Sequence, residues 1–323
     1  MLGKKTLLAG LIASLWGAVA VAETTWDFPT AYPESNMHTQ NIRAFADNVK
    51  KLSNGELVFN IHSNASLFKM PEIKRAIQTN QVQIGEFILT AYANEDPIFE
   101  LDGVPFVASG YDAAWKLYQA QKAYLEKKLE SQGMKLLFTV AWPPQGIFVN
   151  KELNSVDDLK GLKWRAYSPV TAKIAQLVGA QPVTIQQAEL TQALATGAVN
   201  ALMTSSATGY DIKINEFIKY FYDNEAWLPK NAVVVNKKSF SKLTEEQQKV
   251  VMTAAEQAEK AGWELSRQKT DFFKSSLAKE GLKIIKPSET LQNGLVEKTK
   301  IMLEDWKKRA GADGEKLLEA YQK

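Results

Sequence analysis

The sequence predicts an α/β protein built of two lobes, and two observations predict it. Short runs rich in β-branched and aromatic residues alternate with amphipathic stretches of helical periodicity, a pattern typical of sheets covered by helices. The alternation begins again after Pro143 and Pro144, which indicates a second unit of the same class. We expect largely parallel sheets, because strands separated by helical crossovers return in the same direction.

The first half of the chain predicts four strands with helices between them. Apolar runs bounded by turn residues indicate the strands, and Gly55 and Gly133 stand where a helix is expected to end. The strands are expected at 24–30, 56–64, 82–89 and 134–142, and the helices at 41–55, 70–80 and 112–133.

The second half repeats the pattern and adds one long helix. Thr244 and Gln247 have the spacing of a capping box, and helical periodicity then runs to Lys279, before Gly281. This helix is longer than one lobe needs, so we expect it to pack along both; its apolar positions keep no heptad, which argues against a coiled coil. Strands are expected at 146–153, 162–167, 181–185, 199–205 and 231–236, with helices at 168–179 and 187–197.

The N-terminal segment has the pattern of a secretory signal peptide. Lys4 and Lys5 precede an apolar stretch from Leu7 to Val19, and the small residues Ala20 and Ala22 follow. A membrane anchor is the weaker interpretation, because the apolar core is short and no stop-transfer charges follow it. We therefore expect residues 1–22 to be removed near Ala22 and the mature chain to be exported.

The composition excludes several classes of function. With 39 basic and 36 acidic residues, the chain lacks the strongly basic character of a nucleic-acid-binding protein. It has no cysteine, which excludes thiol catalysis, thiolate metal sites and disulfides, and an exported chain of this kind suits a bacterial periplasm. His38 and His62 lie in separate segments, so neither a histidine triad nor a multi-histidine zinc site is expected. We expect no catalytic residue, metal or cofactor.

Two acidic pairs have the chemistry of a glycosidase. Glu95 stands beside Asp96, and Glu100 lies two residues before Asp102. Their sequence context favours solvated loops, and we expect these carboxylates to be exposed rather than catalytic.

Arg165 marks the predicted binding site. It lies at the end of the strand 162–167, and Ser168 and Pro169 then have the residue types of a helix N-cap and first helical position. An arginine fork beside a helix N-terminus suits a planar anion such as a carboxylate or phosphate. The alternative is that Arg165 pairs with one of the acidic residues of the chain.

The ends of the other predicted strands supply the walls of a cleft. Ligands of open parallel sheets bind beyond the carboxyl ends of the strands. Crossing strands at 142–148 and 227–235 would bring the two lobes face to face. The segments at these ends are 30–33, 64–68, 89–92, 142–145, 165–168 and 204–208.

Several stretches carry a family resemblance. They include "FADNVKKLSNGELVFNIHSNASLF" at 45–68, "DDLKGLKWRAYSP" at 157–169 and "ELTQALATGAVNALMTS" at 189–205. The chain resembles the substrate-binding proteins of tripartite ATP-independent periplasmic (TRAP) transporters, the DctP-like solute receptors. The resemblance implies a two-lobed periplasmic-binding-protein-like fold with crossing hinge strands. It also implies a receptor that captures an organic acid and hands it to the permease subunits of the transporter in the membrane.

The resemblance also assigns parts of the chain and roles within the site. Lobe I would hold 24–141 with about 230–270, and lobe II 142–229 with about 271–323. Arg165 falls on the arginine that grips the ligand carboxylate, while Gln145 and Thr204 replace a second arginine and an asparagine common in the family. A monocarboxylate with a 2-oxo, 2-hydroxy or aromatic body is therefore expected. The ligand-binding residues expected are Arg165, Gln145, Thr204, Trp142, Tyr167, Phe68, Asn64, Ser205, Tyr92 and Trp227.

Other functions remain open at this point. A periplasmic enzyme could use Ser168 or Ser205, although neither lies in a Gly-x-Ser-x-Gly elbow and no histidine follows as a base. A receptor that presents its ligand to a membrane sensor would have the same pocket. Trp142 and Trp227 could equally serve to pack the hinge. We expect a monomer.

Overall fold

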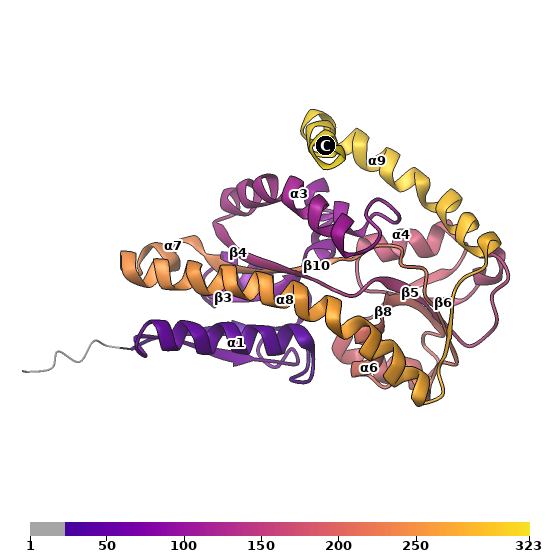
Figure 1. Cartoon of the computed structure of the whole chain (residues 1–323), viewed down its shortest axis with the longest axis horizontal. Helices are drawn as coiled ribbons and strands as arrows, with labels where there is room; N and C mark the ends of the chain where they lie inside the picture. The colour runs from indigo at the N-terminus through magenta and orange to yellow at the C-terminus, as the bar shows by residue number, and fades with distance from the viewer. Residues whose placement is uncertain (1–22) are drawn as a thin grey trace, which may run out of the picture.

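The computed structural model describes residues 23–323 and shows two α/β lobes side by side (Figure 1). The predicted signal peptide at 1–22 lies outside the described residues. Across residues 23–323, no helix has the length and apolar character required to cross a membrane.

Lobe I is built on two sheets. In the first, β1 and β2 run parallel, with α1 connecting them; in the second, β10 lies between β3 and β4. Asn36 caps α1, so this helix starts four residues before its predicted position. The bounds are β1 Thr24–Pro29, α1 Met37–Leu52, β2 Leu57–His62, α2 Met70–Gln78, β3 Ile84–Ile88, α3 Tyr111–Ser131, β4 Met134–Ala141 and β10 Lys230–Asn236.

Lobe II is built on one sheet with the strand order β11-β9-β5-β8-β6-β7. Short helices follow β6, β7 and β8. The bounds are β5 Gln145–Val149, β6 Lys163–Ala166, α4 Pro169–Leu177, β7 Gln181–Thr184, α5 Leu190–Ala195, β8 Ala201–Ser205, α6 Ser206–Asp211, β9 Tyr220–Tyr222 and β11 Lys283–Ile285.

The prediction of largely parallel sheets was wrong, because both lobes contain a strand that runs the other way. β10 is antiparallel to β3 and β4, and β5 is antiparallel to β8 and β9. Every antiparallel pair in residues 23–323 includes one of these two strands. The chain reaches each of these strands directly from the other lobe, without a helix in between. The path between the lobes therefore sets the direction of the strand.

Two long helices tie the lobes together. α8 (Glu245–Lys279) begins at the predicted cap, where Thr244 Oγ1 accepts from Gln247 N at 3.2 Å. It packs on α1 and β4 of lobe I and on α6 and β11 of lobe II, as predicted. After the short α7 (Lys237–Ser241), this helix is the main return across the molecule (Figure 1).

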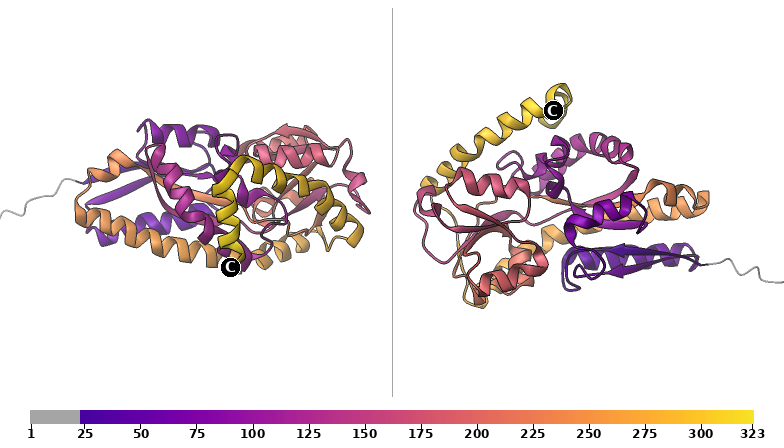
Figure 2. Two further views of the ribbon diagram at one scale, coloured as in Figure 1. Left: turned by 90° about the horizontal axis from the view of Figure 1, so that it is seen from above. Right: turned by 180° about the vertical axis from the view of Figure 1, so that it is seen from behind.

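The sequence analysis did not identify α9 (Glu289–Gln322). This helix starts against α4 and the turn at 156–159 in lobe II and ends against α3 and the turn at 97–99 in lobe I (Figure 2). Gly311 breaks its helical geometry with φ 56°, a left-handed value that glycine adopts without strain. The C-terminal helix therefore forms a second strap across both lobes.

Two carboxylates expected in solvent are buried instead. Asp102 is 3% exposed and lies 3.4 Å from the Nζ of Lys230, which is 0% exposed; Asp102 also accepts from Lys230 N at 2.7 Å. Glu100 pairs with Arg309 of α9 at 2.6 Å. The loop that carries them brings Asp102 to the start of β10 and Glu100 to α9, where each carboxylate has a basic partner.

Candidate functional site

A cavity lies between the lobes, at the edge of the sheets where α4 and α6 begin. About 390 Å³ of space free of protein atoms lies there, a volume that includes open solvent. Lobe I, lobe II and the crossing segments all contribute side chains. The lining residues are Tyr32, Met70, Ile88, Trp142, Gln145, Arg165, Tyr167, Gln186, Gln187, Thr204, Ser205, Thr208 and Pro229.

Arg165 is the cation of this cavity. Its Nε donates to the carbonyl of Ile185 at 2.8 Å, and its Cζ lies 4.9 Å from the ring centroid of Tyr167. The side chain is 3% exposed, and burial lowers its pKa to about 10, which leaves it charged at neutral pH. Within residues 23–323, Arg165 forms no ion pair, and Nη1 and Nη2 have no hydrogen-bond acceptor. The buried charge is therefore available to an anion from outside the chain.

Local sequence holds Arg165 and its neighbours in place. Ser168 caps α4 by accepting from Thr171 N at 3.2 Å, and Pro169 occupies the first helical position, as predicted. Thr171 Oγ1 in turn accepts from the N–H groups of Tyr167 and Ser168. The end of β6 is thus fixed by hydrogen bonds within a few residues of Arg165.

Gln145 and Tyr167 form a polar pair in the cavity wall. The hydroxyl of Tyr167 donates to Gln145 Oε1 at 3.1 Å, and Gln145 Nε2 donates to the carbonyl of Pro143 at 3.0 Å. The backbone N–H of Gln145 donates to the carbonyl of Trp227 at 3.0 Å. Both side chains are therefore preorganised at the crossing between the lobes.

The end of β8 supplies hydroxyl groups. Ser205 caps α6, where its Oγ accepts from Thr208 N at 3.1 Å. Thr204 is 3% exposed, and its Oγ1 has no hydrogen-bond partner within residues 23–323. Thr204 can therefore offer a neutral donor or acceptor to a ligand, whereas Ser205 is engaged in holding the helix.

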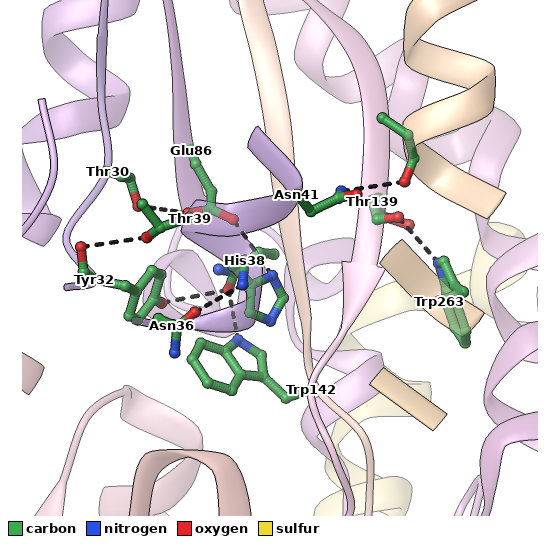
Figure 3. Close-up of polar contacts among 12 residues, drawn as sticks. Thr30, Tyr32, Asn36, His38, Thr39, Asn41, Glu86, Thr139, Trp142 and Trp263 are labelled. Atoms are coloured by element: carbon green, nitrogen blue, oxygen red, sulfur yellow. Dashed lines mark hydrogen bonds and ion pairs between the residues drawn. The ribbon is translucent and has the colours of Figure 1, made fainter. Parts of the chain in front are cut away.

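The cavity wall where lobe I meets the crossing segment is aromatic. Trp142 and Tyr32 meet edge to face with ring centroids 4.9 Å apart, and His38 lies behind them, 4.2 Å from the Trp142 ring (Figure 3). Asn231 Oδ1 accepts from Trp142 Nε1 at 2.8 Å and from the Tyr32 hydroxyl at 3.4 Å. One buried amide on β10 therefore orients both rings.

Some predicted site residues lie outside this lining. Trp227 is fully buried behind the cavity, and Tyr92 donates its hydroxyl to the carbonyl of Met70 and packs on Phe87. Phe68 packs against the lobe I core, and the N–H of Asn64 donates to the carbonyl of Tyr32 in a left-handed turn. The predicted residues that line the cavity are Trp142, Gln145, Arg165, Tyr167, Thr204 and Ser205.

The sequence reasoning missed several lining residues. Tyr32 and Thr208 lie in segments that it had marked as strand ends, while Gln186 and Gln187 follow β7, whose end it did not include. The same strand-end rule would have found both glutamines. Met70, Ile88 and Pro229 carry no such signal, since only the packing of the lobes brings them to the cavity.

The charge of the cavity comes from one side chain. Of the lining residues, Arg165 alone is ionic at neutral pH. Arg43 pairs with Glu34 on the surface, and Lys69 precedes α2 at an exposed position; neither lines the cavity. Residues 23–323 also hold no cluster of three or more His, Cys, Asp or Glu side chains that could bind a metal. The geometry suits an anion with a single negative group.

Comparison with known proteins identifies the family. The family model described as bacterial extracellular solute-binding protein, family 7 (DctP), matches residues 28–309. The chain belongs to this family. The resemblance to TRAP solute receptors, seen first in the "DLKGLK-x-R" stretch, is thereby confirmed. Proteins of this family are periplasmic solute receptors that work with the membrane permease of a TRAP transporter.

Solved receptors of the family match the whole described fold. The receptor DctP6 of Bordetella pertussis, binding pyroglutamic acid, is 60% identical, covers 93% of this chain and 99% of its own, and superposes with a TM-score of 0.92. DctP7 of the same organism, also binding pyroglutamic acid, is 42% identical, with coverage of 93% and 100% and a TM-score of 0.92. A marine metagenome TRAP receptor from an unidentified microbe, in complex with pyroglutamate, is 36% identical, with coverage of 93% and 99% and the same TM-score.

Proposed function

We propose that this receptor binds pyroglutamate in the periplasm and delivers it to a TRAP permease. The observation that carries the proposal is Arg165, a buried guanidinium with no acidic partner in residues 23–323, in a cavity with no other ionic side chain. Three similar receptors bind pyroglutamate, one of them 60% identical to this chain.

The chemistry of pyroglutamate suits the lining of the cavity. This acid is a five-membered lactam with one carboxylate, one N–H donor and one carbonyl acceptor. Arg165 would bind the carboxylate through Nη1 and Nη2, whose fork matches two carboxylate oxygens. Gln187 Nε2 is buried without a partner in residues 23–323 and would donate to the lactam carbonyl. Trp142 and Tyr32 would cover the ring faces.

Charge balance favours a monocarboxylate, as expected from the sequence. A second carboxylate in the closed cavity would lack a cation, and an unpaired buried charge costs several kcal/mol. Pyroglutamate belongs to the monocarboxylate class, although its lactam ring differs from the 2-oxo, 2-hydroxy and aromatic acids considered above. A C4-dicarboxylate would fit this cavity poorly.

The same geometry supports a binding function without chemical conversion of the ligand. Ser168 and Ser205, the serines considered for an enzyme, both act as helix caps. We propose a monomeric receptor without metal or cofactor, exported after cleavage near Ala22. We further propose that the two lobes move relative to each other. Lobe I would comprise 24–141 and about 230–270, and lobe II would comprise 142–229 and about 271–323. The straps α8 and α9 would then bend or slide as the lobes close.

Thermal unfolding and calorimetric titration test the proposal. At 100 times its dissociation constant, pyroglutamate should add about 2.7 kcal/mol to the free energy of unfolding of the mature protein. Proline is a matched control, since it keeps the ring and carboxylate but replaces the neutral lactam with a cationic amine. Stabilisation by proline or succinate, but not by pyroglutamate, would contradict the proposed ligand.

A further inference from the structure

One short helix connects the cavity to the seam between the lobes. α6 (Ser206–Asp211) is capped by Ser205 and carries Thr208, and both of these residues line the cavity; the helix ends at Asp211. The carboxylate of Asp211 accepts from Asn36 Nδ2 at 2.5 Å. Asp211 belongs to lobe II and Asn36 to lobe I, so this hydrogen bond spans the two lobes beside the cavity.

Asn36 is itself fixed to the opposite wall. It is 0% exposed and caps α1, because its Oδ1 accepts from His38 N at 2.8 Å. His38 lies against Trp142, which lines the cavity, and Figure 3 shows Asn36, His38 and Trp142 in one cluster. The side-chain oxygen of Asn36 therefore accepts a hydrogen bond within lobe I, and its side-chain nitrogen donates one to lobe II.

We propose that Asn36 and Asp211 are positioning residues that latch the two lobes over bound pyroglutamate, and that closing this latch takes up a proton near neutral pH. The inference rests on the proposed function and adds a contact outside the cavity to it. Closing would bring both helix termini together only when the ligand allows the cavity walls that carry Thr208 of lobe II and Tyr32 of lobe I to approach.

The pKa of Asp211 depends on whether the lobes are closed or separated. In the closed seam, burial raises the pKa of Asp211 to about 7, against the opposing effect of the Asn36 amide. When the lobes separate, the carboxyl meets water and its pKa returns towards about 3.9. The closed form therefore binds the proton more tightly. Closure is favoured below pH 7 and becomes weaker as the pH rises through 7.

The other charged or titratable side chains near the seam contact groups other than Asp211 or are exposed to solvent. Around α1, Arg43 pairs with Glu34, and His38 lies 3.4 Å from Glu86. On α8, Lys274 pairs with Asp223 and Asp271, and Lys269 lies over Phe272; Lys213 and Glu216 follow α6 and are exposed. No ion pair links Asp211 to any of these groups in residues 23–323.

Calorimetric titration with pyroglutamate tests the latch. Binding to the wild-type receptor should be about tenfold tighter at pH 6 than at pH 8. At pH 7, titrations in two buffers of different ionisation enthalpy should show the uptake of about half a proton per ligand. Neither the carboxylate of the ligand nor Arg165 titrates in this range, so Asp211→Asn should remove both the pH dependence and the proton uptake.

A second variant keeps the fold and strengthens the pH dependence. Asn36→Asp retains a good helix cap but places a carboxylate opposite Asp211, so the two acids share one proton in the closed form. Its binding should be weaker than wild type at pH 8 and should depend more steeply on pH. The matched control is Asp112→Asn on α3, which pairs with Arg267 and lies outside the cavity lining, and it should behave as wild type.

The outcomes separate the two proposals. Tight binding by the wild type with no proton uptake would overturn the latch and leave the proposed ligand standing. A pH dependence that persists in Asp211→Asn would also overturn it. If the wild type bound no pyroglutamate at any pH, the proposed function and the inference resting on it would both fail.

Discussion

The guanidinium of Arg165 lies over the ring of Tyr167, with Cζ 4.9 Å from the ring centroid. The ring faces the cation with its π-electrons, and the hydroxyl of the same tyrosine donates to Gln145. Tyr167 therefore orients both the guanidinium of Arg165 and the side-chain amide of Gln145. The charge of Arg165 is held in place without a carboxylate, which leaves its terminal nitrogens to an incoming acid.

Replacing this anchor should abolish binding. Arg165→Ala should reduce pyroglutamate affinity more than a hundredfold, because loss of one partner of a buried ion pair costs about 3–5 kcal/mol. Arg165→Lys keeps a charge but loses the fork, and its binding should also be severely weakened. Calorimetric titration measures the affinities, and circular dichroism establishes that the variants are folded. Wild-type affinity in a folded Arg165→Ala receptor would mean that the carboxylate binds elsewhere.

The number of negative charges on the ligand should decide affinity. Glutarate has a carbon skeleton of the same length as pyroglutamate but carries two carboxylates, and Arg165 is the only ionic side chain lining the cavity in residues 23–323. We expect glutarate to bind at least a hundredfold more weakly, since its second carboxylate would be buried without a cation. Competition against bound pyroglutamate measures this ratio. Equal or tighter binding of glutarate would reveal a second cation that enters the cavity on closure.

Ligand binding should change the fluorescence of one tryptophan. Trp142 lines the cavity, whereas Trp164 and Trp227 are buried in the core at 0% and 1% exposure. We expect pyroglutamate to alter the emission of the wild type and of Trp227→Phe, and Trp142→Phe to lose most of this change. The signal is followed by titration at a fixed excitation wavelength. An unchanged response in Trp142→Phe would place the reporter outside the cavity.

The buried pair of Asp102 and Lys230 should be important for stability. Burial raises the pKa of Asp102 and lowers that of Lys230, and each charge depends on the other for compensation. Lys230→Met leaves Asp102 buried without its cation and should lower the free energy of unfolding by about 3–5 kcal/mol. Urea unfolding at pH 7 measures the loss.

Two further variants control this prediction. Adding Asp102→Asn to Lys230→Met removes the uncompensated charge and should restore part of the stability. Lys260→Met breaks an exposed pair with Glu256 on the surface and should leave the unfolding midpoint unchanged. A similar loss in both single variants would show that burial of the pair is unimportant.

Close packing under α8 should make Gly262 sensitive to substitution. A Cβ at this position would lie 2.4 Å from Val140 Cγ2 and 2.8 Å from Asn41 Nδ2. We expect Gly262→Ala to destabilise the receptor by about 1–3 kcal/mol, although alanine is the better helix former. Thr253→Ala, at an exposed position of the same helix, should be neutral or slightly stabilising. Urea unfolding compares the two; a stabilised Gly262→Ala would mean that α8 can move away from β4.

Much of the local structure could be predicted because its causes lie within a few residues. The cap at Thr244, the Ser168 and Pro169 start of α4, and the glycine ends of several helices are set by hydrogen bonds and backbone preferences between near neighbours. Arg165 could be placed at the end of a strand for the same reason. The family motifs then assigned it a role that its unpaired state supports.

The tertiary structure decided what joins distant parts of the chain. The reversed direction of β5 and β10 follows from the crossing between lobes. The hydrogen bonds that Asn231 accepts from Trp142 and Tyr32 follow from the position of β10. Asn36 and Asp211 are 175 residues apart in sequence and meet only across the seam. Hydrophobic periodicity indicates which face of an element is buried, but it does not specify the partner. That choice depends on how the lobes pack, so the lining of the cavity and its latch became visible only in the folded chain.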